Sequence, residues 1–331
     1  MPVLAGKEIS NNGLGLMRLT TPGAAVPDEQ AFAVLKAALK AGVNCWNGAD
    51  FYGLPSANSL HLLKRYFTAY PEDAEKVVLC IKSGIADMKT FRPDASPAGL
   101  RASVETANSI LAGTKKIDVF GMARVDPQVP VEESVRALAA LVSEGATGGI
   151  QLSEVGADTI RRAARVARID MVEAEVSLWA DEILSNGVAA ACAELGIPIV
   201  AHTPLGAGVL AGHIRSPDDL PANDYHRFFP RFQPENFGKN LELVDEVRKL
   251  AAGKGCTAAQ LALSWIKLQS RKLGVPPLIP AFGARSADRV AENTKEVLLT
   301  DEDFEAIDKI LSSFPVAGTR YPAPAMKLVK Y

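Results

Sequence analysis

An α/β fold in which parallel strands close a (β/α)8 barrel is predicted by three features of this sequence. Short apolar runs alternate with longer amphipathic stretches along most of the 331 residues, as repeated strand-then-helix units require. Eight such runs can be identified. No linker rich in Gly, Ser or Pro and no low-complexity tract interrupts them, so we expect one barrel domain over residues 1–331, with additional C-terminal helices and loops.

The predicted barrel strands are short and apolar, as strands buried on both faces of a parallel sheet are. They are Gly13 to Met17, Val43 to Trp46, Val77 to Ile81, Ile117 to Gly121, Gly149 to Leu152, Met171 to Glu175, Ile197 to Ala201 and Leu278 to Ala281. The competing fold is a doubly wound sheet, which would carry a GxGxxG turn after its first strand. Gly13-Leu14-Gly15 lacks the third glycine, so the TIM barrel is favoured.

Residues suited to helix ends mark the segments between these strands. Pro27-Asp28-Glu29 and Pro130-Val131 begin two helices, because proline and acidic side chains are favourable at a helix start. Ala41-Gly42 ends the first of these helices. A further helix is predicted over Asp301 to Ser312, and the tail after it, which runs to Tyr331, can cross the barrel mouth and touch substrate.

The stretch from Pro204 to Lys239 is longer than the other predicted connections. Long connections in barrels are often functional loops or lids. The alternative is a surface excursion packed by its own aromatic residues, among them Phe228, Phe229 and Phe232. The sequence supports the two interpretations about equally.

Composition and charge favour a small-molecule substrate over nucleic acid or a membrane. The formal net charge is −2 and the pI about 6.2, so no excess positive charge attracts an anionic polymer or surface. No apolar run reaches membrane-spanning length, and Met1 to Thr20 lacks the features of a secretory signal. The cysteines form no CxxC pair, which predicts neither a disulfide framework nor a metal site. We expect a cytoplasmic protein, with the nucleus as the alternative compartment.

Two polar residues follow neighbouring predicted strands, at the end where barrel enzymes carry catalytic groups. Tyr52 follows the second strand, and Lys82 follows the third. A tyrosine with its ordinary pKa of about 10 is a poor acid at neutral pH, and a nearby ammonium group makes proton donation easier. The pair therefore indicates a proton donor, Tyr52, assisted by Lys82. Alone, each residue would more often be a packing or surface residue.

The segment from Trp46 to Gly53 resembles the D-x-A-x-x-Y-G motif of the aldo-keto reductases. Further residues of this chain resemble other motifs of that family, in the same order. They are Lys82, Leu152-Ser153-Glu154, Ala201 to Leu210, Ile279 to Ser286, Arg289 and Asn293. The resemblance implies a TIM barrel that reduces a carbonyl group with hydride from NADPH. It places Tyr52, Lys82 and Asn47 in the catalytic positions.

Within that family, the chain is most similar to the fungal pyridoxal reductases. The similarity is carried by Phe51-Tyr52-Gly53, Gly113 to Asp118, Ala123 to Pro127 and Leu152 to Val155. It implies reduction of pyridoxal to pyridoxine with NADPH. Ala123, Arg124 and Trp179, which follow predicted strands, are the candidate substrate contacts.

Two catalytic positions depart from the family pattern. Asn47 stands where the family has an aspartate that pairs with the lysine, and Ala123 where a histidine commonly orients the carbonyl, although the alanine is shared with the pyridoxal reductases. An amide can hold Lys82 by a hydrogen bond but carries no charge. Without a negative charge beside Lys82, its positive field on Tyr52 is expected to be stronger. Desolvation acts in the opposite direction, because burial disfavours the charged form of the lysine. Asp50 is a less favoured source of the missing carboxylate.

The resemblance also implies the contacts of the cofactor. Ser153 and Glu154 are expected at the nicotinamide carboxamide, Glu173 stands where a glutamine is frequent, and Val176 where a tyrosine stacks under the ring. The other expected cofactor contacts are Thr203, Leu205, Gly206 and Gly208 for the pyrophosphate, and Arg285, Ser286, Arg289 and Asn293 around a predicted helix start. Guanidinium groups at a helix N-terminus suit the 2′-phosphate, which favours NADPH over NADH.

The leading hypothesis is an NADPH-dependent reductase of an aldehyde or ketone. Asn47, Ala123 and Val176 keep a second class open, an NADP-binding regulatory or interaction protein with weakened catalysis. A third possibility is a reductase of a specialised-metabolite carbonyl. The sequence indicates no oligomeric state.

Overall fold

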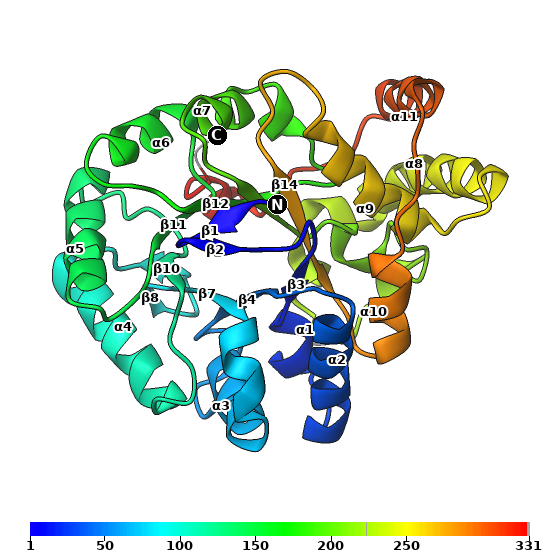
Figure 1. Cartoon of the computed structure of the whole chain (residues 1–331). Coiled ribbons are helices and arrows are strands. Elements are labelled where there is room, and N and C mark those ends of the chain that lie inside the picture. The colour runs from blue at the N-terminus through cyan, green and yellow to red at the C-terminus, as the bar shows by residue number, and fades with distance from the viewer. Residues whose placement is uncertain (223, 330–331) are drawn as a thin grey trace.

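The computed structural model describes residues 1–222 and 224–329, so Asn223 in the long connection and Tyr331 at the end of the tail lie outside the described residues. Parallel strands form a closed barrel in the order β3-β4-β7-β10-β11-β12-β13-β14, surrounded by helices (Figure 1). The barrel closes where β14 pairs with β3, with Ala281 opposite Gly13. The predicted TIM barrel is confirmed, and the doubly wound alternative is excluded because the last strand returns to the first.

Each predicted strand is present, with ends that differ by a few residues. The barrel strands are β3 (Gly13–Gly15), β4 (Cys45–Ala49), β7 (Val78–Ser83), β10 (Val119–Met122), β11 (Ile150–Ser153), β12 (Met171–Glu175), β13 (Ile199–His202) and β14 (Leu278–Gly283). Met17 was predicted in the first strand but begins helix α1, and β4 continues past its predicted end at Trp46. The extension of β4 carries Asn47 into the barrel wall.

The predicted helix starts are confirmed at Asp28, after Pro27, and at Val131, after Pro130. The helices are α1 (Met17–Thr20), α2 (Asp28–Lys40), α3 (Ser59–Ala69), α4 (Pro97–Leu111), α5 (Val131–Ser143), α6 (Ala157–Ala164), α7 (Val188–Glu194), α8 (Pro234–Gly253), α9 (Ala258–Gln269), α10 (Ala287–Thr294), α11 (Asp301–Ser313) and α12 (Ala323–Met326). Within the described residues, none is long and apolar enough to cross a membrane.

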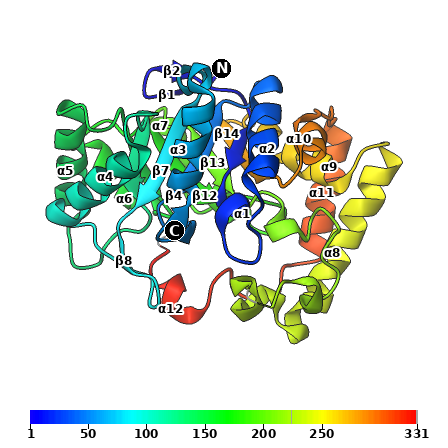
Figure 2. The ribbon, with the colours of Figure 1, turned by 90° about the horizontal axis from the view of Figure 1, so that it is seen from below.

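Three short hairpins were not predicted, because their strands are too short to show a periodicity. They are β1 (Val3–Leu4) with β2 (Lys7–Glu8), β5 (Gly53–Leu54) with β6 (Ala57–Asn58), and β8 (Ile85–Asp87) with β9 (Arg92–Pro93). Leu4 and Ile9 are buried against the barrel interior with Cys80 and Met171. The hairpin β1-β2 therefore closes the end of the barrel opposite the long connection and α12 (Figure 2).

The long connection folds into short 3-10 helices at the barrel mouth. They are η3 (Gly206–Gly208), η4 (Pro217–Asp219), η5 (Tyr225–Phe228) and η6 (Pro230–Phe232), and two others, η1 (Pro71–Lys76) and η2 (Glu182–Leu184), lie elsewhere. Aromatic rings of the connection pack on each other, as in the 5.2 Å centroid separation of His226 and Phe232. Arg18 of α1 also binds Asp224 at 2.9 Å. The segment is thus packed by its own aromatic residues and fastened across the mouth.

Candidate active site

Tyr52 lies in a turn after β4 whose conformation is held by backbone contacts. Its N–H donates to the carbonyl of Ala49 at 3.3 Å, and its own carbonyl accepts from the hydroxyl of Thr20 at 2.6 Å. Gly53 follows with φ +125°, and a Cβ there would lie 2.5 Å from the carbonyl oxygen of Ala57, so only glycine fits. This turn directs the chain back toward α3.

Lys82 lies near the end of β7, directly opposite Ala49 of β4 in the parallel register. Its ammonium nitrogen is 4.7 Å from the centroid of the Tyr52 ring. The two residues expected to cooperate are therefore brought together, because successive parallel strands carry them to the same end of the barrel.

A buried cluster of three side chains surrounds the lysine nitrogen. Lys82 Nζ donates to Asn47 Oδ1 at 2.8 Å and forms an ion pair with Glu173 Oε1, also at 2.8 Å. Asn47 Nδ2 donates to Glu173 Oε2 at 3.0 Å, which closes the triangle. The Lys82 and Glu173 side chains are only 5% and 1% exposed, so solvent screens this ion pair little.

The carboxylate that partners Lys82 is therefore Glu173, which sequence reasoning had placed among the cofactor contacts. The expectation of a lysine without a nearby anion was wrong, and Asp50 accepts a hydrogen bond from Ser83 instead. Strands β10 and β11 lie between β7, which carries Lys82, and β12, so Glu173 reaches the lysine from across the barrel. The sequence contains a signal for this pairing. Asn47 is an amide where the family has a carboxylate, and Glu173 is a carboxylate where the family frequently has an amide.

The protonation states of this cluster follow from burial and charge. Burial raises the pKa of Tyr52, and the Lys82 ammonium opposes this only in part, since Glu173 acts in the same direction as burial. Burial alone would lower the pKa of Lys82, but the Glu173 carboxylate outweighs it and the pKa is raised. The same ion pair lowers the pKa of Glu173 against its burial. At neutral pH, Tyr52 and Lys82 are thus protonated and Glu173 is ionised.

The two residues expected at the nicotinamide carboxamide have different surroundings. The Ser153 hydroxyl is buried and has no hydrogen-bond partner among the described residues. Glu154 accepts from His202 Nε2 at 2.6 Å and binds Arg320 of the tail at 2.8 Å. Arg320 also binds Glu175 at 2.9 Å. Ser153 thus keeps the capacity to bind an amide, whereas Glu154 anchors the tail in a buried ion-pair network.

The loop expected to hold the pyrophosphate contains several residues with positive φ. Thr203 and Gly206 have φ of +51° and +55°, and Gly208 has φ +104°. Leu205 precedes η3, and its carbonyl accepts from the N–H of Gly208 at 2.9 Å. Trp179 lies against this loop, since a Cβ at Gly206 would be 3.4 Å from its ring. Trp179 is buried rather than exposed at the mouth.

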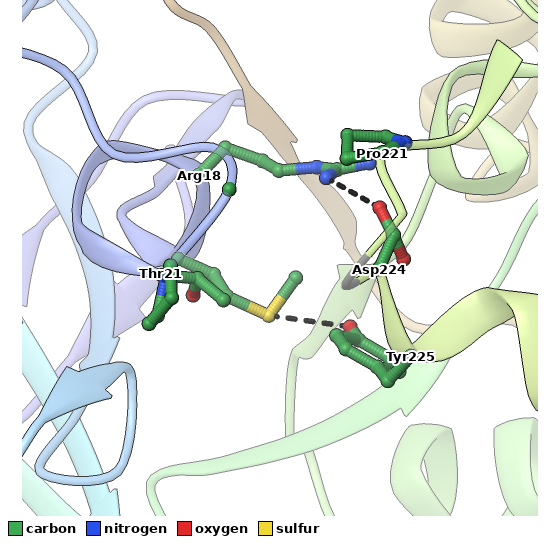
Figure 3. A pocket seen from close by; sticks show the side chains of 8 residues that line it. Arg18, Thr21, Pro221, Asp224 and Tyr225 are labelled. Atoms are coloured by element: carbon green, nitrogen blue, oxygen red, sulfur yellow. Dashed lines mark hydrogen bonds and ion pairs between the residues drawn. The ribbon is translucent and has the colours of Figure 1, made fainter.

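A narrow pocket separates α1 from the long connection (Figure 3). Arg18 reaches across it to Asp224, and Tyr225 donates to the sulfur of Met17 at 3.5 Å. Thr21 lines the same pocket. These contacts join the first strand-end loop of the barrel to η5.

The residues expected at the cofactor's 2′-phosphate lie at the start of α10. Ser286 is the N-cap, and its hydroxyl accepts from the N–H of Arg289 at 3.3 Å. The Arg289 guanidinium pairs with Glu292 one turn further on, and the carbonyl of Arg285 accepts from Gln30. The remaining expected contact, the side chain of Asn293, is buried in the same helix.

Ala123 and Arg124 follow β10, which pairs with β7, the strand that carries Lys82. The N–H of Ala123 donates to the carbonyl of Ser83 at 2.8 Å, and its side chain is fully buried. The guanidinium of Arg124 lies 5.5 Å from the ring centroid of Phe91 and 5.7 Å from that of Tyr321. The Arg124 guanidinium therefore lies close to two aromatic rings.

The fold and the site together are those of an α/β barrel with a tyrosine and a buried lysine side by side at one mouth. The family model described as "Aldo/keto reductase family" matches residues 13–312, and the chain belongs to this family of oxidoreductases. The members use nicotinamide cofactors and act on small molecules.

Similar proteins cover almost the whole chain. The "Probable pyridoxal reductase 2" of Schizosaccharomyces pombe is 37% identical over 97% of each chain. The "Putative pyridoxal reductase" of Saccharomyces cerevisiae is 36% identical, over 94% of this chain and 95% of that protein. Among solved structures, a glycerol dehydrogenase from Gluconobacter oxydans matches with a TM-score of 0.81 and 25% identity, over 96% of this chain and 97% of that chain. The expected similarity to fungal pyridoxal reductases is confirmed.

Proposed function

We propose that this protein is an NADPH-dependent carbonyl reductase, with pyridoxal as its first candidate substrate. The observation that carries the proposal is the Lys82, Glu173 and Asn47 cluster beside Tyr52. It maintains a protonated tyrosine next to a protonated lysine at neutral pH, as proton delivery to a carbonyl requires. The similarity to two proteins described as pyridoxal reductases supports the choice of substrate.

The residues of the mouth fit a nicotinamide dinucleotide. The buried Ser153 hydroxyl, which lacks a partner among the described residues, can bind the carboxamide. Thr203, Leu205, Gly206 and Gly208 would hold the pyrophosphate, and the Arg285, Ser286, Arg289 and Asn293 group would hold the 2′-phosphate. The bound cofactor supplies hydride to the carbonyl carbon.

The chain's own residues manage the proton and the developing charge. Tyr52 donates its hydroxyl proton to the carbonyl oxygen as negative charge develops there. Lys82 stabilises the resulting tyrosinate electrostatically. Glu173 keeps Lys82 charged, and Asn47 fixes the position of the lysine nitrogen.

Replacing Tyr52 by phenylalanine tests this assignment. We expect Tyr52→Phe to lower kcat for pyridoxal by a factor on the order of 10² to 10⁴, the typical contribution of a general acid. NADPH affinity, followed by fluorescence titration, should change little. Tyr225→Phe is the matched control, because Tyr225 lies at the same mouth and its hydroxyl contacts Met17.

Unchanged turnover in Tyr52→Phe would refute the mechanism. Tight NADPH binding by the wild-type protein without turnover of any carbonyl would instead support the regulatory alternative. A panel that includes other aldehydes and ketones, scored with NADPH and NADH, separates pyridoxal from a specialised-metabolite substrate.

A further inference from the structure

The C-terminal tail is fixed at one point after α11. Asn240 of α8 binds Ala317 twice, since its Oδ1 accepts from the Ala317 N–H at 2.7 Å and its Nδ2 donates to the Ala317 carbonyl at 3.0 Å. Gly318 follows with φ +84°, and a Cβ there would lie 2.9 Å from the backbone of Pro230, so only glycine fits. From this fixed turn the tail continues along the mouth end of the barrel (Figure 2). We call residues 318–321 the strap.

Two consecutive residues of the strap contact opposite parts of the mouth. Arg320 Nη2 binds Glu154, which follows β11, at 2.8 Å. The centroid of the Tyr321 ring lies 5.7 Å from the guanidinium of Arg124, which follows β10, and 5.4 Å from the ring centroid of Phe229 in the long connection. The strap therefore connects the ends of barrel strands with the long connection.

The strap places a buried guanidinium group against two carboxylates. The Arg320 side chain is only 3% exposed, and it binds Glu175, at the end of β12, at 2.9 Å in addition to Glu154. Hydrogen bonds between ionised groups are stronger than those between neutral groups. Since both ion pairs act on one side chain, the strap can leave the strand ends only when Arg320 gives up both carboxylates.

The two ion pairs adjoin the group proposed to bind the nicotinamide carboxamide. That group is the Ser153 hydroxyl, which has no hydrogen-bond partner among the described residues and belongs to a residue only 1% exposed. Ser153 directly precedes Glu154, and it lies opposite Glu173, two positions before Glu175 on β12. A nicotinamide ring can reach so deeply buried a hydroxyl only after a covering group moves. Arg320 binds a carboxylate on each of the two strands concerned.

We propose that the strap closes the mouth and must open before the nicotinamide ring enters, and that the Arg320 ion pairs hold it closed. This inference rests on the proposed function, because it takes the nicotinamide cofactor as the entering ligand. During opening, Arg320 exchanges its carboxylates for water, while the contacts of Asn240 keep the base of the strap in place. At high cofactor concentration, the rate of opening then limits entry.

Glu175→Gln weakens the ion pairs but leaves Arg320 paired with Glu154, so no buried charge is left alone. The matched control is Asp181→Asn, which removes one exposed carboxylate from the loop after the same strand. Opening is measured without cofactor by trypsin, which cleaves after Arg320 only while this buried residue is accessible, so that the rate follows the open population. Cleavage after the exposed Lys327 of the same tail is the internal reference.

We expect Glu175→Gln to raise the rate of cleavage after Arg320 about tenfold, as loss of a charge-assisted hydrogen bond implies. Cleavage after Lys327 should be unchanged, and Asp181→Asn should behave as wild type. Arg320→Lys keeps a charge and a trypsin site but loses the planar pair of donors, so it should also raise the cleavage rate.

Stopped-flow fluorescence with NADPH measures entry of the cofactor. In wild type, the observed binding rate should reach a plateau as the NADPH concentration increases, because opening becomes limiting. Glu175→Gln should raise that plateau about tenfold, in parallel with its effect on trypsin cleavage. The plateau of Asp181→Asn should equal that of wild type.

The same cleavage rate after Arg320 in wild type and Glu175→Gln, or an equal increase in Asp181→Asn, would overturn the role of the ion pairs. A binding rate that rises linearly with NADPH at all concentrations would overturn the requirement for opening. Faster cleavage in Glu175→Gln, combined with no NADPH binding by wild type, would refute the proposed cofactor and with it the closing of the mouth against that cofactor, while the ion pairs would still be shown to hold the strap.

Discussion

At the scale of single residues, the proposed catalytic centre has a carboxylate beside Lys82, but on a different strand from the one that the family resemblance implies. Lys82 is nearly fully buried, and a buried ammonium group without an anion is strongly destabilised. The anion is contributed by Glu173 of β12, while Asn47 of β4 contributes a neutral amide. The change at position 47 is therefore compensated within the barrel, and the substitution alone gives no reason to expect an inactive protein.

Exchanging the two side chains tests this compensation. Glu173→Gln should lower kcat by about tenfold or more and destabilise the fold by about 3–5 kcal/mol, because it leaves a buried charge unpaired. The double variant Asn47→Asp with Glu173→Gln returns one carboxylate to the lysine and should recover most of both losses. Steady-state kinetics and urea unfolding measure the two quantities.

Asn47→Asp alone is the informative control. It places a second carboxylate at Glu173, where Asn47 Nδ2 now lies 3.0 Å from Oε2, so we expect lower stability and no gain in turnover. A gain in turnover from Asn47→Asp alone would show that Glu173 does not replace the missing aspartate.

At the scale of elements, two segments outside the strand-helix repeat build the mouth. The long connection is fastened by Arg18 to Asp224, and Arg231 of η6 donates to the Trp179 carbonyl at 2.5 Å. The tail is fastened by Arg320 to Glu154 and Glu175. Ionic contacts of this kind allow a segment without long helices or strands to keep a defined position.

The contact between Arg18 and Asp224 should control how easily η5 opens. Burial would raise the pKa of Asp224, but His226 and Arg18 hold it well below its usual value. Asp224→Asn removes the charge that Arg18 binds, so we expect amide hydrogen exchange in Tyr225–Phe228 to rise about tenfold. Glu235→Gln, at an exposed acid near the end of the same connection, should leave that exchange rate unchanged. Equal rates in Asp224→Asn and wild type would mean that aromatic packing alone holds η5.

At the scale of the whole molecule, buried ion pairs join strand ends that the backbone ladder does not connect. Lys82 and Glu173 link β7 to β12, and Arg320 links the tail to β11 and β12. The backbone hydrogen bonds between the barrel strands do not span the mouth, whereas these ion pairs do. Their stabilisation depends on carboxylates that stay ionised.

Acid should therefore weaken the fold through these pairs. The pKa values of Glu154 and Glu173 are lowered on folding against their burial, by His202 and Arg320 for the first and by Lys82 for the second. A carboxyl group whose pKa is lower in the folded state stabilises the fold fully when the pH is above its pKa in the unfolded state, 4.5. This stabilisation is lost as the pH falls through the pKa of the folded state. The free energy of unfolding in urea should therefore fall as the pH is lowered below about 5.

Arg320→Met should lower that free energy at neutral pH by about 3–5 kcal/mol and make the further loss in acid smaller, because without this cation the folded-state pKa of Glu154 lies closer to its unfolded value. Lys327→Met is the control, since Lys327 is an exposed cation of the same tail. Superimposable pH curves for wild type and Arg320→Met would show that the network does not govern acid stability.

The amino-acid sequence alone determined the barrel, its strand order and the approach of Tyr52 to Lys82. Apolar periodicity reports strands and helices, and successive parallel strands must present their ends together, so that pair follows from local pattern. The roles predicted for the cofactor contacts rest on resemblance and remain predictions. Helix starts at Asp28 and Val131 were predictable for a similar reason, since capping preferences are local.

Only the tertiary structure decided which charges meet. Asn47 and Glu173 are 126 positions apart, and Glu154 and Arg320 are 166 apart. Their contacts depend on barrel closure, on strand register and on which side chains point inward, and no local pattern encodes these together. Arg124 lies close to Phe91 and Tyr321 for the same reason, because a loop and the tail approach it only once the barrel is closed.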